Sequence, residues 1–172
     1  EYGQTYEGRE LNYAVVTSKA NHTDLEEIRV NNLRRTGLEP GELSGNTKPI
    51  VWLSYNVHGN ETSSSEAAMN TLHRLLTENS NWLNDVVVIM DPMINPDGRD
   101  RYVNWYRSVA GKFVNPDLDA REHREPWPGG RTNHYYFDLN RDWAWQTQIE
   151  SQHRIRLYNQ WMPQVHVDFH EQ

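Results

Sequence analysis

The sequence predicts an α/β fold with a mixed, mainly parallel sheet that carries helices on both faces. Two observations support this class. Three runs, at 49–57, 85–90 and 164–169, have the β-branched and aromatic content of buried strands. Stretches between them repeat apolar residues at the helical period, and strands that alternate with helices of roughly 12 to 18 residues form βαβ units.

The first half of the chain is predicted to hold two strands and two helices. Residues 11–17 are β-prone, and a helix then begins at Thr23-Asp24 and ends at Gly37. The strand at 49–57 leads into a helix at 64–78, which Thr62 and the serines after it can cap. The apolar residues that define these two helices are Leu25, Ile28 and Leu33 in the first, and Ala68, Leu72, Leu75 and Leu76 in the second.

The second half begins with the strand at 85–90. Asn95-Pro96-Asp97-Gly98 predicts a tight turn, because Pro presets φ and Gly accepts a positive φ, and 99–109 follows as a helix. The polar segment 110–134 is rich in Pro and Gly, which indicates a surface excursion of about 25 residues. The last predicted elements are a short extended segment at 137–140, a helix at 147–161 with Ile155, Tyr158 and Met162 on its apolar side, and the strand at 164–169 after Pro163.

Composition excludes several classes of protein. The chain of 172 residues has 17 Lys and Arg against 24 Asp and Glu, so it has no basic stripe to bind nucleic acid. Its apolar runs are far shorter than the roughly 20 residues of a membrane span, and its start lacks a signal-peptide pattern. Because there is no Cys, any metal must be held by His, Asp or Glu. The length fits one domain or part of one.

Residues with metal-binding chemistry stand at strand ends, where ligands of parallel sheets collect. His58 and Glu61 follow the strand at 49–57 and are joined by the flexible Gly59, and His170 follows the strand at 164–169. Two His and one Glu with an open fourth position form the catalytic pattern for Zn²⁺. Taken alone, however, His58 could be an ordinary surface histidine and Glu61 a carboxylate favoured at a helix start.

A polar cluster, Asp138-Leu139-Asn140-Arg141, precedes the last helix. Beside a metal site, Asn140 and Arg141 offer an amide and a planar fork for a carboxylate, and Asp138 can orient a metal-binding His. Taken alone, the cluster is a polar turn. Its functional interpretation therefore depends on the metal site.

Together these segments resemble the zinc carboxypeptidase family, the peptidases similar to carboxypeptidase A. The similar segments appear in family order over nearly the whole chain. They are Glu7-Gly8-Arg9, His58-Gly59-Asn60-Glu61, Asn95-Pro96-Asp97-Gly98, Asp138-Leu139-Asn140-Arg141 and Asp168-Phe169-His170.

The resemblance implies that His58, Glu61 and His170 bind Zn²⁺, and that Asp138 orients a zinc-binding His. His166 is the alternative third ligand, because residues 166, 168 and 170 of an extended strand point the same way. We favour His170, which lies at the carboxyl end of its strand, where the family places its ligand.

The resemblance also implies a substrate, a peptide with a free C-terminus, whose terminal carboxylate Asn140 and Arg141 would bind. Arg107 is our candidate for the arginine that polarises the scissile carbonyl. Arg99 and Arg101 lie close to it in the sequence.

The family's general base is a Glu that is supplied well downstream of the third ligand. Here the sequence ends at Gln172, and Glu171 would face away from its strand neighbour His170. We therefore predict that 1–172 is the N-terminal portion of a single zinc peptidase catalytic domain, that the general base lies beyond Gln172, and that the fragment alone is inactive.

Other functions remain open at this stage. The same zinc and arginine would serve an amidase that acts on cell-wall peptides or acyl amino acids, and the chain could also be a non-catalytic module that binds a metal or a peptide. A purely structural role without metal is a further alternative. The acidic, aromatic composition and the start just ahead of the domain favour secretion or a periplasmic location.

Overall fold

A computed structural model describes residues 1–171 of the chain. Its main sheet has four strands in the order β3 (Ala14–Val16), β5 (Val87–Asp91), β4 (Ile50–Tyr55) and β6 (Val165–Phe169). Strand β4 is parallel to both β5 and β6, and only β3 runs antiparallel, at one edge. Two short strands, β1 (Gly3–Gln4) and β2 (Glu10–Leu11), form a separate antiparallel pair. The mixed, mainly parallel fold class is confirmed.

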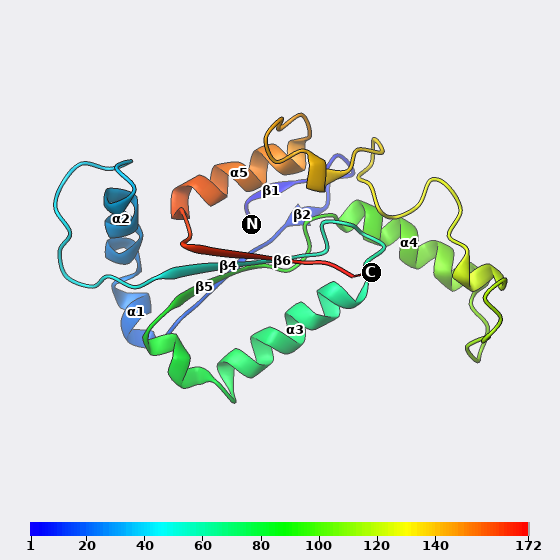
Figure 1. Ribbon diagram of the computed structural model, residues 1–172, viewed down its shortest axis with the longest axis horizontal. Helices are drawn as coiled ribbons and strands as arrows, with labels where there is room; N and C mark the ends of the chain where they lie inside the picture. The colour runs from blue at the N-terminus through cyan, green and yellow to red at the C-terminus, as the bar shows by residue number, and fades with distance from the viewer. Residues whose placement is uncertain (172) are drawn as a thin grey trace.

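Helices cover both faces of the main sheet (Figure 1). On one face, Trp52 and Ile89 pack against α5 (Ile149–Trp161) and α2 (Leu25–Arg35). On the other, Tyr55 and Met90 pack against α3 (Ser63–Leu76) and the 3₁₀ turn η1 (Ser80–Asn84). Alternate residues of each strand therefore serve opposite cores. The remaining elements are α1 (Lys19–Thr23), α4 (Pro96–Val109), η2 (Arg121–His123) and η3 (Leu139–Arg141).

The single strand predicted at 11–17 is wrong in detail. Leu11 pairs with Gly3 in the small sheet, whereas 14–16 pair with β5 in the main one. The predicted start of the next helix also divides, because Thr23 ends α1 and Asp24 precedes α2. Elements as short as β1 and α1 show no periodicity that a sequence pattern could reveal.

The tight turn predicted at Asn95-Pro96-Asp97-Gly98 is instead the first turn of α4. The Asn95 side chain accepts a hydrogen bond from the Gly98 N–H at 2.9 Å, and Pro96 occupies the first helical turn, where it loses no helical bond. The buried Asp97 accepts bonds from Thr5 Oγ1 and Arg9 Nη1, both at 2.8 Å. Two sequence motifs, Glu7-Gly8-Arg9 and Asn95-Pro96-Asp97-Gly98, thus bind each other and tie the N-terminal segment to α4.

The apolar sides of two helices differ from the predicted ones. In α5 the core residues are Leu157 and Trp161, joined by Tyr158, while Met162 adopts a left-handed φ of 45° and caps the helix. In α3 the predicted Leu76 is 56% exposed. Both helices nevertheless form where the sequence predicts them.

The predicted surface excursion at 110–134 contains only the short turn η2. The buried Glu122 organises it by accepting backbone N–H bonds from Gly111 and Asn115. The extended segment predicted at 137–140 is wrong, because Asp138 accepts a bond from the Asn140 N–H and starts η3 there. Within residues 1–171, no helix has the length and apolarity needed to cross a bilayer.

Candidate metal centre

The loop that follows β4 is shaped by Asn56, a residue that the sequence analysis missed. Asn56 has a left-handed φ of 58° and is fully buried. Its side-chain amide donates to the backbone oxygens of His58 and Glu61, both at 2.9 Å, and its N–H bonds Ser64 Oγ at 2.8 Å. Asn is one of the few residue types that tolerate a left-handed φ. Its position directly after a strand is therefore the sequence signal that could have revealed the role of Asn56.

Gly59 permits close packing at this loop, so its interpretation as a flexible joint is wrong. A Cβ on Gly59 would lie 2.2 Å from the Arg99 N atom and 2.5 Å from the Gly130 oxygen. The loop after β4, the start of α4 and the end of the surface excursion therefore meet backbone to backbone. Glu125 strengthens this junction by accepting bonds from Asn60 Nδ2, at 2.8 Å, and from the Gly130 N–H.

The structure brings His58, Glu61 and His170 together. His58 Nδ1 lies 2.7 Å from Glu61 Oε1, and His170 Nδ1 lies 3.1 Å from Glu61 Oε2. One ligand atom from each of the three residues lies within 4.8 Å of the others. His58 is almost fully buried and His170 is more exposed, so the group opens on one side.

His166 lies apart from this group. Its ring packs against Trp143 and Tyr158, and its Nε2 lies 2.8 Å from Ser54 Oγ on the face of the sheet that α5 covers. Burial lowers the pKa of His166, which favours its neutral form. His170, beyond the last residue of β6, is the histidine that reaches Glu61.

Asp138 fixes the proton of His58. His58 Nε2 donates to Asp138 Oδ1 at 3.0 Å. Although burial raises the pKa of Asp138, its hydrogen bonds with His58 and the Asn140 N–H, together with the Arg131 charge, hold it below its ordinary value. An ionised carboxylate only accepts, so Nε2 carries the proton and Nδ1 presents its lone pair to Glu61.

Two acceptors, His58 Nδ1 and Glu61 Oε1, thus face each other at 2.7 Å. Such a contact requires a proton or a metal cation between the two atoms. His170 Nδ1 adds a third potential ligand atom, which a proton shared by His58 and Glu61 would not contact. The donor set of two imidazoles and a carboxylate therefore fits Zn²⁺.

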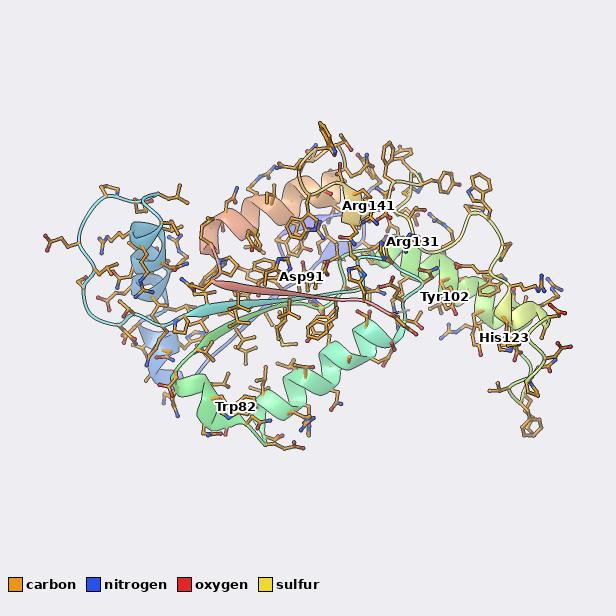
Figure 2. The ribbon with its side chains drawn as sticks, viewed as in Figure 1. Trp82, Asp91, Tyr102, His123, Arg131 and Arg141 are labelled. Atoms are coloured by element: carbon orange, nitrogen blue, oxygen red, sulfur yellow. The ribbon has the colours of Figure 1, made fainter. Side chains whose placement is uncertain are left out.

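Two arginines lie near this group. Arg131 Nη1 donates to His58 Nδ1 at 3.3 Å and lies 3.8 Å from Glu61 Oε1, while Nη2 pairs with Asp138 Oδ2 at 3.0 Å. Arg141 is exposed and follows Asn140, whose Nδ2 lies 3.3 Å from His170 Nε2. Figure 2 shows both arginines on the side of the sheet where β6 ends.

The sequence profile of the zinc carboxypeptidase family matches residues 1–163. The chain belongs to the zinc carboxypeptidase family. This family uses Zn²⁺, and the cluster of His58, Glu61 and His170 is a group that could bind it.

Solved carboxypeptidase structures share the fold. Carboxypeptidase A from Helicoverpa armigera is 14% identical, with a TM-score of 0.59, over 100% of this chain and 40% of its own. The metallo-carboxypeptidase from Burkholderia cenocepacia is 17% identical, with a TM-score of 0.60, over 100% and 36%. That from Pseudomonas aeruginosa, in complex with (2-guanidinoethylmercapto)succinic acid, is 16% identical, with a TM-score of 0.61, over 99% and 34%. The chain thus spans between 34% and 40% of these three structures. No curated protein sequence matches the chain.

Arg107 lies in the last turn of α4. It is the arginine predicted from the sequence to polarise the scissile carbonyl. It lines a pocket of about 570 Å³ with Arg99, Tyr102 and Tyr106. Among residues 1–171, its side chain has no hydrogen bond or ion pair with the three predicted ligands, whereas Arg131 bonds one of them. Sequence reasoning missed Arg131 because it stands in the irregular excursion, 73 residues from His58 along the chain.

Glu171, the acid beside His170, points toward α3. Its Oε2 accepts bonds from the Ser63 N–H at 3.1 Å and from Ser63 Oγ at 2.7 Å. Glu171 therefore caps α3, a role predicted for Thr62 and the serines after it. The side chain of Thr62 makes no capping bond.

Proposed function

We propose that the full-length protein is a zinc metallocarboxypeptidase that hydrolyses the peptide bond next to a free C-terminal carboxylate, and that residues 1–172 supply its metal ligands and its carboxylate-binding site. The observation that carries this proposal is the position of Arg141. Its neighbour Asn140 contacts the metal-ligand histidine His170, so a carboxylate held by Arg141 would place the adjacent peptide bond near the metal centre.

Arg141 is available for such a carboxylate. Within residues 1–171, its guanidinium has one hydrogen bond, from Nη1 to the Asn140 oxygen at 3.4 Å, and no ion pair. The two carboxylates beside it are already engaged. Asp142 accepts three bonds from Thr147 and Gln148, and Asp138 bonds His58 and Arg131. A bidentate guanidinium selects a charged terminus over an amidated one.

The space around Arg141 admits a side chain. A pocket of about 300 Å³ is bounded by Phe137, Trp145 and Arg141, and both aromatic rings are at least half exposed. The proposed substrate would place its terminal carboxylate against the guanidinium and its last side chain near these rings.

His58, Glu61 and His170 would hold Zn²⁺ through the two Nδ1 atoms and the carboxylate. Zinc at this position would supply a Lewis acid and lower the pKa of water toward about 7. The chain's own residues orient and bind: Asp138 fixes the ring of His58, and Arg131 presents N–H donors where negative charge develops on the carbonyl oxygen.

The proton acceptor is proposed to lie outside residues 1–172. Glu171, the acid next to His170 in the sequence, accepts bonds from Ser63, and Asp138 is bonded to His58 and Arg131. Neither carboxylate is placed to take a proton from an attacking water.

The test compares matched peptides with a free and an amidated C-terminus, using the full-length protein and its Arg141→Ala variant. We expect the wild type to bind one equivalent of zinc and to cleave the free peptide preferentially. Arg141→Ala should raise KM for the free peptide and remove the preference, while zinc stoichiometry stays the same. Retention of the preference in Arg141→Ala would refute the carboxylate role. Cleavage of acylated amino acids or cell-wall peptides in place of both peptides would support an amidase, and zinc binding without any cleavage would support a binding module.

A further inference from the structure

His170 has a carboxylate on its outer nitrogen, as His58 does. Asp168 Oδ2 lies 3.2 Å from His170 Nε2, on the side of the ring opposite the Nδ1 atom that faces Glu61. The corresponding distance from Asp138 Oδ1 to His58 Nε2 is 3.0 Å. Each imidazole therefore lies between Glu61 on one side and an aspartate on the other.

Asp168 is itself anchored in the sheet. Its Oδ1 accepts a bond at 3.0 Å from Ser54 Oγ, on the neighbouring strand β4, and Ser54 is fully buried. Because the Ser54 hydroxyl proton points to Asp168, His166 Nε2, 2.8 Å from the same oxygen, must be a donor to it. His166 is in turn held between Trp143 and Tyr158. The order of donors is thus His166 to Ser54 to Asp168, and each group has a defined position.

Asp168 is also the only suitable acceptor at His170 Nε2 among the described residues. The other neighbour of this nitrogen, Asn140 Nδ2 at 3.3 Å, is itself an N–H donor and cannot accept a proton. A carboxylate that only accepts keeps the proton on Nε2, which leaves the Nδ1 lone pair directed at the metal position.

We propose that Asp168 is a positioning residue for the metal ligand His170: it fixes the tautomer and the orientation of the ring, and Ser54 and His166 hold Asp168 in place. The inference rests on the metal site of the proposed function. The two aspartates act alike, but Asp138 is attached to the loop that carries Arg131 and Arg141, whereas Asp168 is attached to the sheet. Metal-binding histidines depend on such partners, and loss of the partner weakens metal affinity roughly 10- to 100-fold.

The experiment measures zinc affinity of the full-length protein by competition with a chelator, for wild type, Asp168→Ala and Asp168→Asn. The absorption spectrum of the Co²⁺-substituted forms and the urea unfolding of the metal-free forms are measured in parallel. Asp138→Ala shows that the assay detects loss of such a partner. Glu171→Gln is the matched control, since it removes the carboxylate next to His170 in the sequence, which bonds Ser63 rather than a metal ligand.

We expect Asp168→Ala to weaken zinc binding roughly 10- to 100-fold and to alter the Co²⁺ spectrum. Asp168→Asn should lose less affinity, because its amide oxygen still accepts from Nε2, and Glu171→Gln should bind as wild type does. Ser54→Ala should give a smaller loss of the same sign. If Asp168→Ala fails to fold, Asp168→Asn and Ser54→Ala decide the question.

Zinc affinities of all Asp168 and Ser54 variants within twofold of wild type, with a weakened Asp138→Ala, would overturn the inference and leave the proposed function intact. A fall in metal-free stability without a change in affinity or in the Co²⁺ spectrum would also overturn it, because it would indicate a purely structural role. Absence of zinc binding by the wild type would instead overturn the proposed function.

Discussion

Replacement of Arg131 by alanine should lower kcat far more than replacement of Arg107. Arg131 Nη1 lies 3.3 Å from His58 Nδ1 and 3.8 Å from Glu61 Oε1, so its N–H groups reach the space that a carbonyl oxygen must enter to approach the metal ligands. The ion pair from Nη2 to Asp138 Oδ2, at 3.0 Å, keeps the guanidinium there before substrate arrives. In the proposed reaction, Arg131 would therefore be preorganised for charge that appears only in the transition state.

The magnitude follows from that geometry. Loss of one preorganised donor to a developing oxyanion costs about 100- to 1,000-fold in kcat, or roughly 3 to 4 kcal/mol. Because the interaction is made in the transition state, kcat should fall while KM changes little. Arg131→Lys keeps the charge but loses the planar fork that also bonds Asp138, so we expect an intermediate rate.

The assay is steady-state hydrolysis of a blocked dipeptide with a free C-terminus by the zinc-loaded full-length protein, with zinc content measured for each variant. Arg107→Ala is the matched control, since it removes an exposed arginine that bonds none of the three predicted ligands. A larger loss of kcat in Arg107→Ala than in Arg131→Ala would refute this reasoning and support the assignment predicted from the sequence.

Two further predictions concern the scaffold of the site. Gly59→Ala should reduce both the stability of the fold and the zinc affinity. The new Cβ would lie 2.2 to 2.5 Å from three backbone atoms, and no side-chain rotation can relieve these clashes. Thermal unfolding measures the first effect and chelator competition the second. Asp91 is fully buried between α5 and the sheet (Figure 2), and burial raises its pKa to about 7. Between about pH 4 and pH 7, Asp91 is therefore protonated in the folded protein and ionised in the unfolded chain. The unfolding free energy of wild type relative to Asp91→Asn should therefore fall as pH rises through this window, by at most about 1.4 kcal/mol per pH unit.

Each of these predictions has a result that contradicts it. Wild-type zinc affinity in Gly59→Ala would mean that the loop, α4 and the excursion need not pack so closely. A stability difference between wild type and Asp91→Asn that stays constant or grows from pH 4 to pH 7 would show that Asp91 is ionised in the folded protein, with Arg154 as its partner charge.

The grouping of His58, Glu61 and His170 could be predicted because its signal is local. His58 and Glu61 are three residues apart directly after a strand, and His170 directly follows another; the chemistry of the residue types and the rule for parallel sheets suffice to bring them together. The long helices and central strands were likewise visible, because each spans enough residues for an apolar period to appear. The position of Asn140 and Arg141 beside the site came from the family resemblance and not from any period.

The rest depended on contacts between residues that are far apart in the chain. Arg131 and Arg107 are equivalent as residue types, and only the path of the excursion places Arg131 against His58, 73 residues away. The pairing of Arg9 with Asp97, 88 residues away, ties the N-terminal segment to the first turn of α4. Gly59 is required for close packing against a backbone more than 30 residues distant.

The sequence by itself determined the fold class, the donor set and the strand ends at which the donors stand, since these follow from residue chemistry and short-range periodicity. Only the tertiary structure decided that Arg131, and not Arg107, lies beside the predicted metal ligands. It also decided that His170, and not His166, reaches Glu61, and that Asp168 and Ser54 support His170. Asp168 and Ser54 are 114 residues apart and meet because β4 and β6 pair in register. Such pairings are set by the packing of the whole sheet, which no local pattern encodes.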